Sequence, residues 1–486
     1  MSTPWPDIVA AAGAAFAAGA AAVPSVNRYL KSLRRLRSRR QYQDRLAQVE
    51  AEVTAEGAAE GAAAPPSAGA PPGATAVTIP RDIPRGVPCF YATHLDVRQL
   101  RCFAAASLDL RFPGERNDLA LPNVNLLLGD NGAGKSTILK AIAMAALGPV
   151  LEGSGFYPFK LVREGASKAS VDCAFLFNGA AEPTVLPSRV SVARRGDLEL
   201  VDATTDSPHW SDLFDESSPS FFVVGYGTNR RVSSDPRSDP AMERGRQRRR
   251  YARVSSLFDD SIALVPFAAW LPQADETHQA DVRDLLDCLL PDDVHFTGEF
   301  AGSEPIFGSS GVQVPLRAMS DGFRSYIGWL GDLLFQMSAA LPPGLRLHEM
   351  GGIALVDEVD LLLHPSWQRR VVPDISRALP NIQFVFTTHS PIVTGTLQAA
   401  NIVVARQDEE TGVSTLARVD AEVFGLNAEQ VLLSSYFDLE TTRAPGAGPT
   451  LDNLARRAVE GDLEATSEYL RALTSGIPDP PGESAP

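Results

Sequence analysis

The feature that most constrains this chain is the stretch GDNGAGKST at residues 129–137. It matches the pattern G-x-x-x-x-G-K-[ST] in full, follows the apolar run 124–128 and precedes the helical pattern 138–147. In such a strand–loop–helix unit, glycines let several backbone N–H groups turn toward one point, and the positive end of the following helix faces the same point. The stretch therefore predicts a loop that binds the phosphates of a nucleotide.

The residues of this loop have separate expected roles. The Lys135 ammonium group is expected to reach the β- and γ-phosphates, and the Ser136 hydroxyl to supply an oxygen ligand to Mg²⁺. The expected cofactors are accordingly ATP and Mg²⁺. The candidate nucleotide-binding residues of the loop are Gly129, Asn131, Gly132, Gly134, Lys135, Ser136 and Thr137.

A pair of carboxylates follows a second apolar run. In GGIALVDEVD, the run 353–356 leads directly into Asp357 and Glu358. A buried carboxylate pair is costly unless a cation or hydrogen bonds compensate its charge. With Mg²⁺ the two roles separate, because Asp357 would hold the metal, usually through water, while Glu358 would polarise the attacking water. The alternative is a solvated acidic turn.

Two further elements are less specific when each is taken alone. The apolar run in NIQFVFTTHSP leads to His389, which either donates a hydrogen bond to the γ-phosphate or only satisfies a local carbonyl group. Ser320, Asp321 and Gly322 open a helical pattern and form either a second anion site or an ordinary helix N-cap. The order phosphate loop, Ser-Asp-Gly, Asp-Glu and histidine favours the functional interpretation of both.

The coarse pattern predicts an α/β fold. Apolar runs typical of strands lie at 126–128, 221–224, 353–356 and 382–386. Nearly continuous apolar runs indicate strands buried on both faces, as in a parallel sheet, and such a sheet binds ligands at the carboxyl ends of its strands. The hydrophobic fraction of 44% and the charged fraction of 21% are typical of a globular protein.

The length of 486 residues exceeds one ordinary core, and changes in composition predict the boundaries. The Ala/Gly/Pro-rich spacer has too few large apolar groups to order itself. The expected parts are an N-terminal Ala-rich and basic helical segment at 1–55, a disordered linker at 56–79, the nucleotide-binding domain at 80–440 with an insertion around 150–310, and a helical C-terminal tail at 441–486.

Charge and cysteine content restrict the partners and the compartment. The formal net charge of −15 excludes a uniformly basic nucleic-acid coat, so the basic run RGRQRRRYAR, Arg244 to Arg253, is either a local nucleic-acid contact or an ordinary solvated loop. Four cysteines without paired spacing are typical of reduced thiols in a cytoplasmic protein. The uncharged stretch 8–23 is short for a membrane span, which leaves an inner-membrane anchor as the alternative to a packing or oligomerisation helix.

Together these motifs resemble the ATPase head of the ABC superfamily, in its soluble SMC-type and RecF-like branch, often described as AAA-type ATPases. More narrowly, the chain is similar to the ATPase subunits of bacterial anti-phage systems such as Septu and certain retrons. The resemblance covers roughly residues 85–440 and rests on YATHLDVRQLRCFAAASLDL, GYGTNRR, VSSLFDD, AMSDGFRS, DEVDLLLHPSWQ and TTHSP.

The resemblance implies an ABC-type P-loop head with a mixed or parallel sheet and an inserted helical subdomain. In such proteins the phosphate loop of one head faces the signature of another, so ATP closes a homodimer or higher oligomer. The implied catalytic residues are Glu358, Lys135 and His389, the implied contacts in trans are Ser320 and Gly322, and the implied metal ligands are Ser136 and Asp357. The signature MSDGF departs from the usual LSGGE, because Asp321 replaces a glycine and no acidic residue follows.

The expected function is ATP hydrolysis, with an ATP-dependent dimer that controls a separately encoded effector, such as a nuclease, in anti-phage defence. The 97 residues after His389 lack the carboxylate cluster of a Toprim-type nuclease, and the interval before Ser320 has no sustained heptads for a long coiled-coil arm. In GYGTNRR, an arginine would sense nucleotide or signal to the insertion. Two alternatives stay open: a DNA-repair-type, DNA-dependent ATPase, and a nucleotide-gated scaffold that does not hydrolyse ATP.

Overall fold

A computed structural model describes residues 89–468, apart from short gaps of which the longest is 233–249. The described chain forms two compact units; the first ends at Gly425 and the second begins at Leu426. This division falls earlier than the expected start of the helical tail. The expected N-terminal helical segment, its apolar stretch 8–23 and the linker lie outside the described residues.

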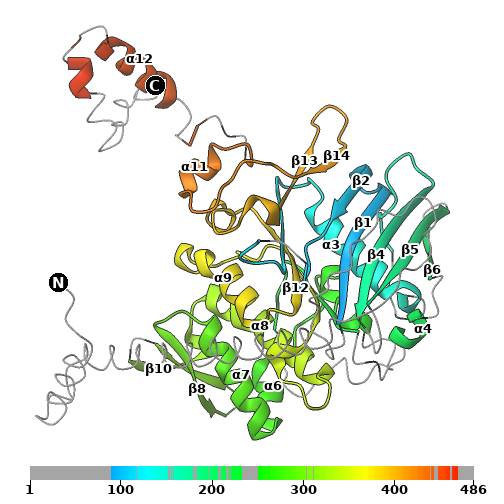
Figure 1. Cartoon of the computed structure of the whole chain (residues 1–486). Helices are drawn as coiled ribbons and strands as arrows, with labels where there is room; N and C mark the ends of the chain where they lie inside the picture. The colour runs from blue at the N-terminus through cyan, green and yellow to red at the C-terminus, as the bar shows by residue number, and fades with distance from the viewer. Residues whose placement is uncertain are drawn as a thin grey trace, which may run out of the picture. The chain divides into compact units, whose positions relative to one another are not determined.

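The first unit is built on a six-stranded, mainly parallel sheet (Figure 1). Its strand order is β14–β13–β3–β12–β11–β7, and β14 alone of these runs antiparallel to its neighbour. Each predicted apolar run forms or overlaps one of its strands, which confirms the α/β fold. The strands are β3 (Val124–Gly129), β7 (Val223–Tyr226), β11 (Gly352–Val356), β12 (Ile382–Thr388), β13 (Ile402–Gln407) and β14 (Ser414–Ala417).

A second, five-stranded antiparallel sheet has the order β2–β1–β4–β5–β6. Helix α3 (Lys135–Leu147) contacts strands of both sheets, and nearly all of its residues are buried. A helix covered on both sides must be apolar all around, which explains the run of Ile, Leu, Met and Ala in its sequence. The strands of this sheet are β1 (Cys89–Leu100), β2 (Phe103–Asp109), β4 (Lys168–Asn178), β5 (Thr184–Arg195) and β6 (Leu198–Thr204).

The expected insertion around 150–310 is only partly a separate helical part. Strands β4 to β7 belong to the two sheets, whereas the later residues form short helices and a three-stranded antiparallel sheet, β10–β9–β8. The remaining elements of the first unit are α4 (His209–Phe214), α6 (Phe267–Trp270), α7 (Glu276–Leu289), β8 (Val294–Ala301), β9 (Glu304–Ser309), β10 (Val312–Pro315), α8 (Asp321–Ala340), α9 (Pro365–Ala378) and α10 (Pro391–Thr394).

A buried glutamine joins the two large sheets. The Gln383 side chain of β12 is fully buried; its Oε1 accepts from the Ala92 N–H (2.8 Å), and its Nε2 donates to the carbonyl oxygens of Ala92 (2.6 Å) and Arg111 (2.7 Å). Ala92 lies where the pairing of β1 with β4 shifts register. The amide therefore holds the irregular part of β1 against the central sheet.

The second unit contains α11 (Ala428–Leu432) and α12 (Ala447–Val459). Helix α11 begins with a capping box, in which Asn427 Oδ1 accepts from the Gln430 N–H (2.9 Å) and Gln430 Oε1 accepts from the Asn427 N–H (3.0 Å). Within the described part of the chain, no helix has both the length and the apolar character needed to cross a bilayer.

Candidate nucleotide-binding site

Three of the sequence motifs meet at one edge of the central sheet. Strands β3, β12 and β11 are parallel neighbours, and the pairing of Val356 with Phe386 and of Thr388 with Leu128 aligns their carboxyl ends. The phosphate loop follows β3, the Thr-Thr-His segment ends β12, and the Asp-Glu pair follows β11. This is the edge at which parallel sheets bind ligands.

The phosphate loop folds around its own lysine. Lys135 opens α3, is 6% exposed, and its Nζ donates to the carbonyl oxygens of Gly129 (2.7 Å) and Asp130 (3.0 Å). Gly134 precedes the helix with φ 98°, a left-handed conformation that disfavours any residue with a Cβ. A Cβ added there would lie 2.5 Å from Cys102 Sγ, so the loop also packs tightly against the turn between β1 and β2.

The lysine also contacts the predicted histidine. Lys135 Nζ lies 2.8 Å from His389 Nε2. Burial lowers the pKa of Lys135, against the opposing charges of Asp357 and Glu358. Burial and the Lys135 charge lower the pKa of His389, so its imidazole is neutral near pH 7 and its Nε2 accepts the lysine proton as a hydrogen bond.

A threonine that sequence analysis did not single out orients the carboxylate pair. The Thr387 hydroxyl donates to Asp357 Oδ1 (2.5 Å) and accepts from the Glu358 N–H (2.7 Å). Thr387 and Asp357 are both buried, whereas Glu358 is partly exposed. The next threonine, Thr388, donates in the same way to Asp360. The sequence shows two hydroxyl residues at the end of a buried strand, but it does not show which strand lies beside them.

The donor set at this edge fits a nucleotide with Mg²⁺. A buried ammonium group needs an anionic partner, and the loop surrounds it with the start of a helix. A hydroxyl at Ser136 and a carboxylate at Asp357 are the hard oxygen ligands that Mg²⁺ prefers. Among the described residues, no group of three or more His, Cys, Asp or Glu side chains could hold a metal ion.

The Ser-Asp-Gly signature lies at the start of α8. Ser320 is exposed and caps the helix, since its Oγ accepts from the Phe323 N–H (3.3 Å). Asp321 pairs with Arg324 in the same turn. In the described part of the chain, no hydrogen bond joins the signature to the phosphate loop of its own molecule.

The signature instead touches the loop behind the carboxylates. A Cβ added at Gly322 would lie 2.1 Å from the Leu362 carbonyl oxygen, so only glycine permits this approach. The Leu362 side chain is 62% exposed, and its backbone has φ 61°. The Ser-Asp-Gly signature and the segment following Glu358 therefore lie in direct contact with each other at the protein surface.

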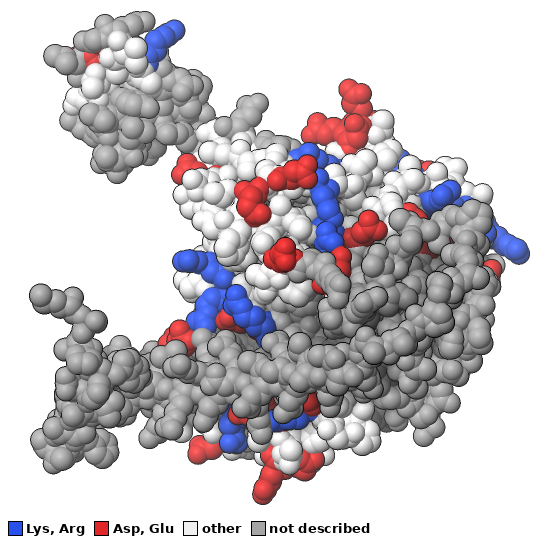
Figure 2. Space-filling model, viewed as in Figure 1, with Lys and Arg blue, Asp and Glu red and all other residues white. Residues whose placement is uncertain are grey.

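The described end of the basic run does not form an open basic surface. Arg250 is 8% exposed, and its guanidinium carbon lies 4.6 Å from the centre of the Phe221 ring. Arg253 stacks in the same way over Phe222, at 5.6 Å. Both guanidinium groups therefore lie over aromatic rings, and Arg250 is buried; residues 244–249 lie outside the described residues, so the interpretation of the run as a nucleic-acid contact stays a prediction. On the face shown in Figure 2, described side chains of both charges are interspersed.

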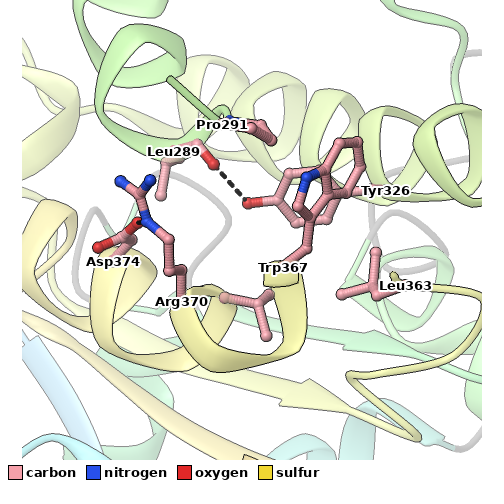
Figure 3. Close-up of a pocket in the computed structure, with 8 residues that line it drawn as sticks. Leu289, Pro291, Tyr326, Leu363, Trp367, Arg370 and Asp374 are labelled. Atoms are coloured by element: carbon pink, nitrogen blue, oxygen red, sulfur yellow. Dashed lines mark hydrogen bonds and ion pairs between the residues drawn. The ribbon is translucent and has the colours of Figure 1, made fainter. Parts of the chain in front are cut away.

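A small apolar pocket lies apart from this site, between α7, α8 and α9 (Figure 3). The Tyr326 hydroxyl donates to the Leu289 carbonyl oxygen (3.0 Å) beside it, and the ion pair of Arg370 with Asp374 (3.1 Å) lies at its edge. None of its lining residues belongs to the phosphate loop or to the carboxylate pair.

Comparisons with known proteins agree with these motifs. The Septu protein PtuA of Bacillus mycoides (strain KBAB4) is 26% identical over 322 residues, 65% of this chain and 41% of that protein. The Retron Ec83 probable ATPase of Escherichia coli is 30% identical over 129 residues, 26% of this chain and 24% of that protein. The Retron Vc95 probable ATPase of Vibrio cholerae serotype O1 biovar El Tor is 31% identical over 137 residues, 28% of this chain and 25% of that protein. The chain thus spans about two-fifths of PtuA and a quarter of each retron protein.

Among solved structures, an SMC head bound to the C-winged helix domain of ScpA is 15% identical, with a TM-score of 0.43 over 68% of this chain and 97% of that one. A family model described as "AAA domain, putative AbiEii toxin, Type IV TA system" matches residues 124–394. The match covers more than half of the chain and includes the phosphate loop, the signature, the carboxylate pair and the histidine. The chain therefore belongs to this AAA-domain family.

Proposed function

We propose that this protein hydrolyses ATP, and that ATP-dependent association of two copies controls a separately encoded effector in anti-phage defence. The observation that carries the proposal is the convergence of Lys135, His389 and the Asp357–Glu358 pair at one edge of the parallel sheet. The names of the retron relatives, probable ATPases, support the hydrolytic activity. The similarity to a Septu protein and to retron proteins supports the role in defence.

The protein's own groups divide the work of hydrolysis. Lys135 and the N–H groups at the start of α3 bind the phosphates, and neutral His389 orients the lysine. Ser136 and Asp357 would hold Mg²⁺, which when bound supplies positive charge to the phosphate oxygens. Glu358 accepts a proton from the attacking water, and the partial exposure of its side chain leaves it accessible to that water.

In the proposed dimer, the second copy contacts the nucleotide through its Ser-Asp-Gly signature. Ser320 is exposed at the positive end of α8, a 20-residue helix. Within the described chain, no hydrogen bond joins it to the phosphate loop of the same molecule. That helix end suits the γ-phosphate of a nucleotide bound by another copy. ATP held in this way contacts both chains, so its hydrolysis removes a shared ligand.

Steady-state turnover of Mg-ATP with two variants tests the hydrolytic site. Lys135→Ala should abolish ATP binding, because the buried ammonium group is the main charge of the loop. Glu358→Gln should bind ATP and lower kcat by on the order of 10²-fold or more, since it removes the general base. Glu299→Gln, which neutralises an exposed carboxylate on β8 in the separate three-stranded sheet, is the matched control. Wild-type turnover in Glu358→Gln would eliminate the mechanism.

Association is tested in the same background. Glu358→Gln with ATP should elute as a dimer in size-exclusion chromatography with light scattering. Adding Ser320→Arg should keep it monomeric while leaving the affinity of the monomer for ATP unchanged, because the arginine obstructs only the contact in trans. A dimer that persists would contradict the proposed interface.

Turnover that requires added DNA would favour the repair-type ATPase, and a wild-type protein that binds ATP without turnover would favour the scaffold.

A further inference from the structure

Arg230 lies directly behind the carboxylate turn. It belongs to the GYGTNRR segment that follows β7, and it is 7% exposed. Its Nη2 donates to the carbonyl oxygens of both Asp357 and Glu358, the latter at 2.7 Å. The guanidinium carbon lies 5.6 Å from the centre of the Trp329 ring on α8. Its hydrogen bonds therefore go to backbone oxygens and leave the two carboxylate groups for other partners.

The turn that Arg230 contacts has an unfavourable backbone conformation. Glu358 has φ 47°, in the left-handed region, which is unfavourable for a residue with a Cβ. Such a conformation persists only when neighbouring groups fix it. The Thr387 hydroxyl holds the Glu358 N–H, and Arg230 holds the Glu358 carbonyl group, so both peptide groups of the residue are fixed.

The chemistry of a guanidinium group suits this position better than that of an ammonium group. One nitrogen reaches two carbonyl oxygens while the guanidinium carbon lies over an indole ring. Burial lowers the pKa of Arg230 to about 10, which an arginine tolerates without losing its charge at pH 7. The shorter, spherical charge of a lysine cannot make the stacked contact and both hydrogen bonds together.

We propose that Arg230 is a positioning residue for hydrolysis, which fixes the backbone of Glu358 so that its carboxylate meets the attacking water. Through Trp329 it also connects this turn to α8, the helix that begins with the signature. The inference rests on the proposed function, and it differs from the expectation that an arginine of GYGTNRR senses nucleotide, because the hydrogen bonds of Arg230 go to backbone oxygens of the turn.

The test compares Arg230→Lys and Arg230→Gln with Arg231→Gln, which alters the exposed neighbouring arginine. Both Arg230 variants should keep the wild-type ATP affinity and KM, while kcat falls on the order of 10- to 100-fold, as expected when a catalytic group is misplaced by a fraction of an ångström. Arg230→Lys should retain more activity than Arg230→Gln. Arg231→Gln should behave as wild type. An unchanged kcat, or an equal loss in ATP affinity, would overturn the proposal.

A double variant separates positioning from general stabilisation. Because Arg230 acts through Glu358, adding Arg230→Lys to Glu358→Gln should not lower the residual kcat further; multiplying effects would overturn the proposal. If the Arg230 variants do not fold, Trp329→Phe decides instead, with a smaller fall in kcat at constant KM supporting the link and a wild-type kcat refuting it. Absence of turnover in the wild-type protein would refute the proposed function itself, which keeps the two failures distinguishable.

Discussion

Replacing Gln383 with methionine removes the hydrogen bonds that join β12 to β1 and to Arg111, while nearly keeping the length and volume of the side chain. The Ala92 N–H then loses its acceptor in a site with no solvent exposure, and the carbonyl oxygens of Ala92 and Arg111 each lose a donor. An unpaired buried donor costs about 1–3 kcal/mol, and each lost hydrogen bond to a carbonyl about 0.5–1.5 kcal/mol. The free energy of unfolding should therefore fall by about 2–6 kcal/mol.

Differential scanning calorimetry of the full chain measures this loss as a fall in Tm of about 3–8 °C for a unit of this size. Gln313→Met on β10, where the side chain is exposed, provides the matched control and should change Tm little. The residual folded protein should still bind ATP, since Gln383 lies away from the carboxyl ends of the strands. A Gln383→Met variant as stable as the wild type would refute the view that this amide holds the two sheets together.

Two further predictions concern the phosphate loop and the cysteines. Gly134→Ala should weaken ATP binding at least about tenfold in isothermal titration calorimetry, because the new Cβ meets Cys102 Sγ at 2.5 Å and the backbone has φ 98°; wild-type affinity would show that the loop relaxes around the methyl group. Burial raises the pKa of Cys89 to about 12 and the pKa of Cys173 well above its ordinary value, so both stay protonated at pH 8. Iodoacetamide should leave both unmodified in the folded protein and alkylate them in urea, as peptide mass mapping would show; rapid native labelling would contradict the burial.

Much of the site could be predicted because its residues end buried strands. A parallel sheet aligns the carboxyl ends of its strands, so polar residues that follow apolar runs collect at one edge whatever the strand order is. Lys135, His389 and the Asp357–Glu358 pair were found in this way, and the structure brings them together. The four buried strands were predicted for the same reason.

The supporting residues could not be found from the sequence, because their roles depend on which strands become neighbours. Thr387 orients Asp357 only because β12 lies beside β11, and Arg230 reaches the same turn only because β7 lies on the other side. In the antiparallel sheet, buried and more exposed residues alternate along β5, whose buried residues include Leu186 and Val190. The order of the strands in that sheet depends on long-range pairing, which the sequence pattern does not show. Sequence pattern thus identifies chemistry at strand ends better than it identifies what holds that chemistry in place.

The close approach of Gly322 to Leu362 has a mechanical consequence. The space between the two backbone segments is too small for a methyl group, so a displacement of the first turn of α8 toward Leu362 pushes the loop after Glu358 as well. Under the proposed function, a partner that pushes on that turn also shifts the residues next to the general base. Binding of a second copy and placement of the general base for hydrolysis would then occur together, coupled through the contact between Gly322 and Leu362.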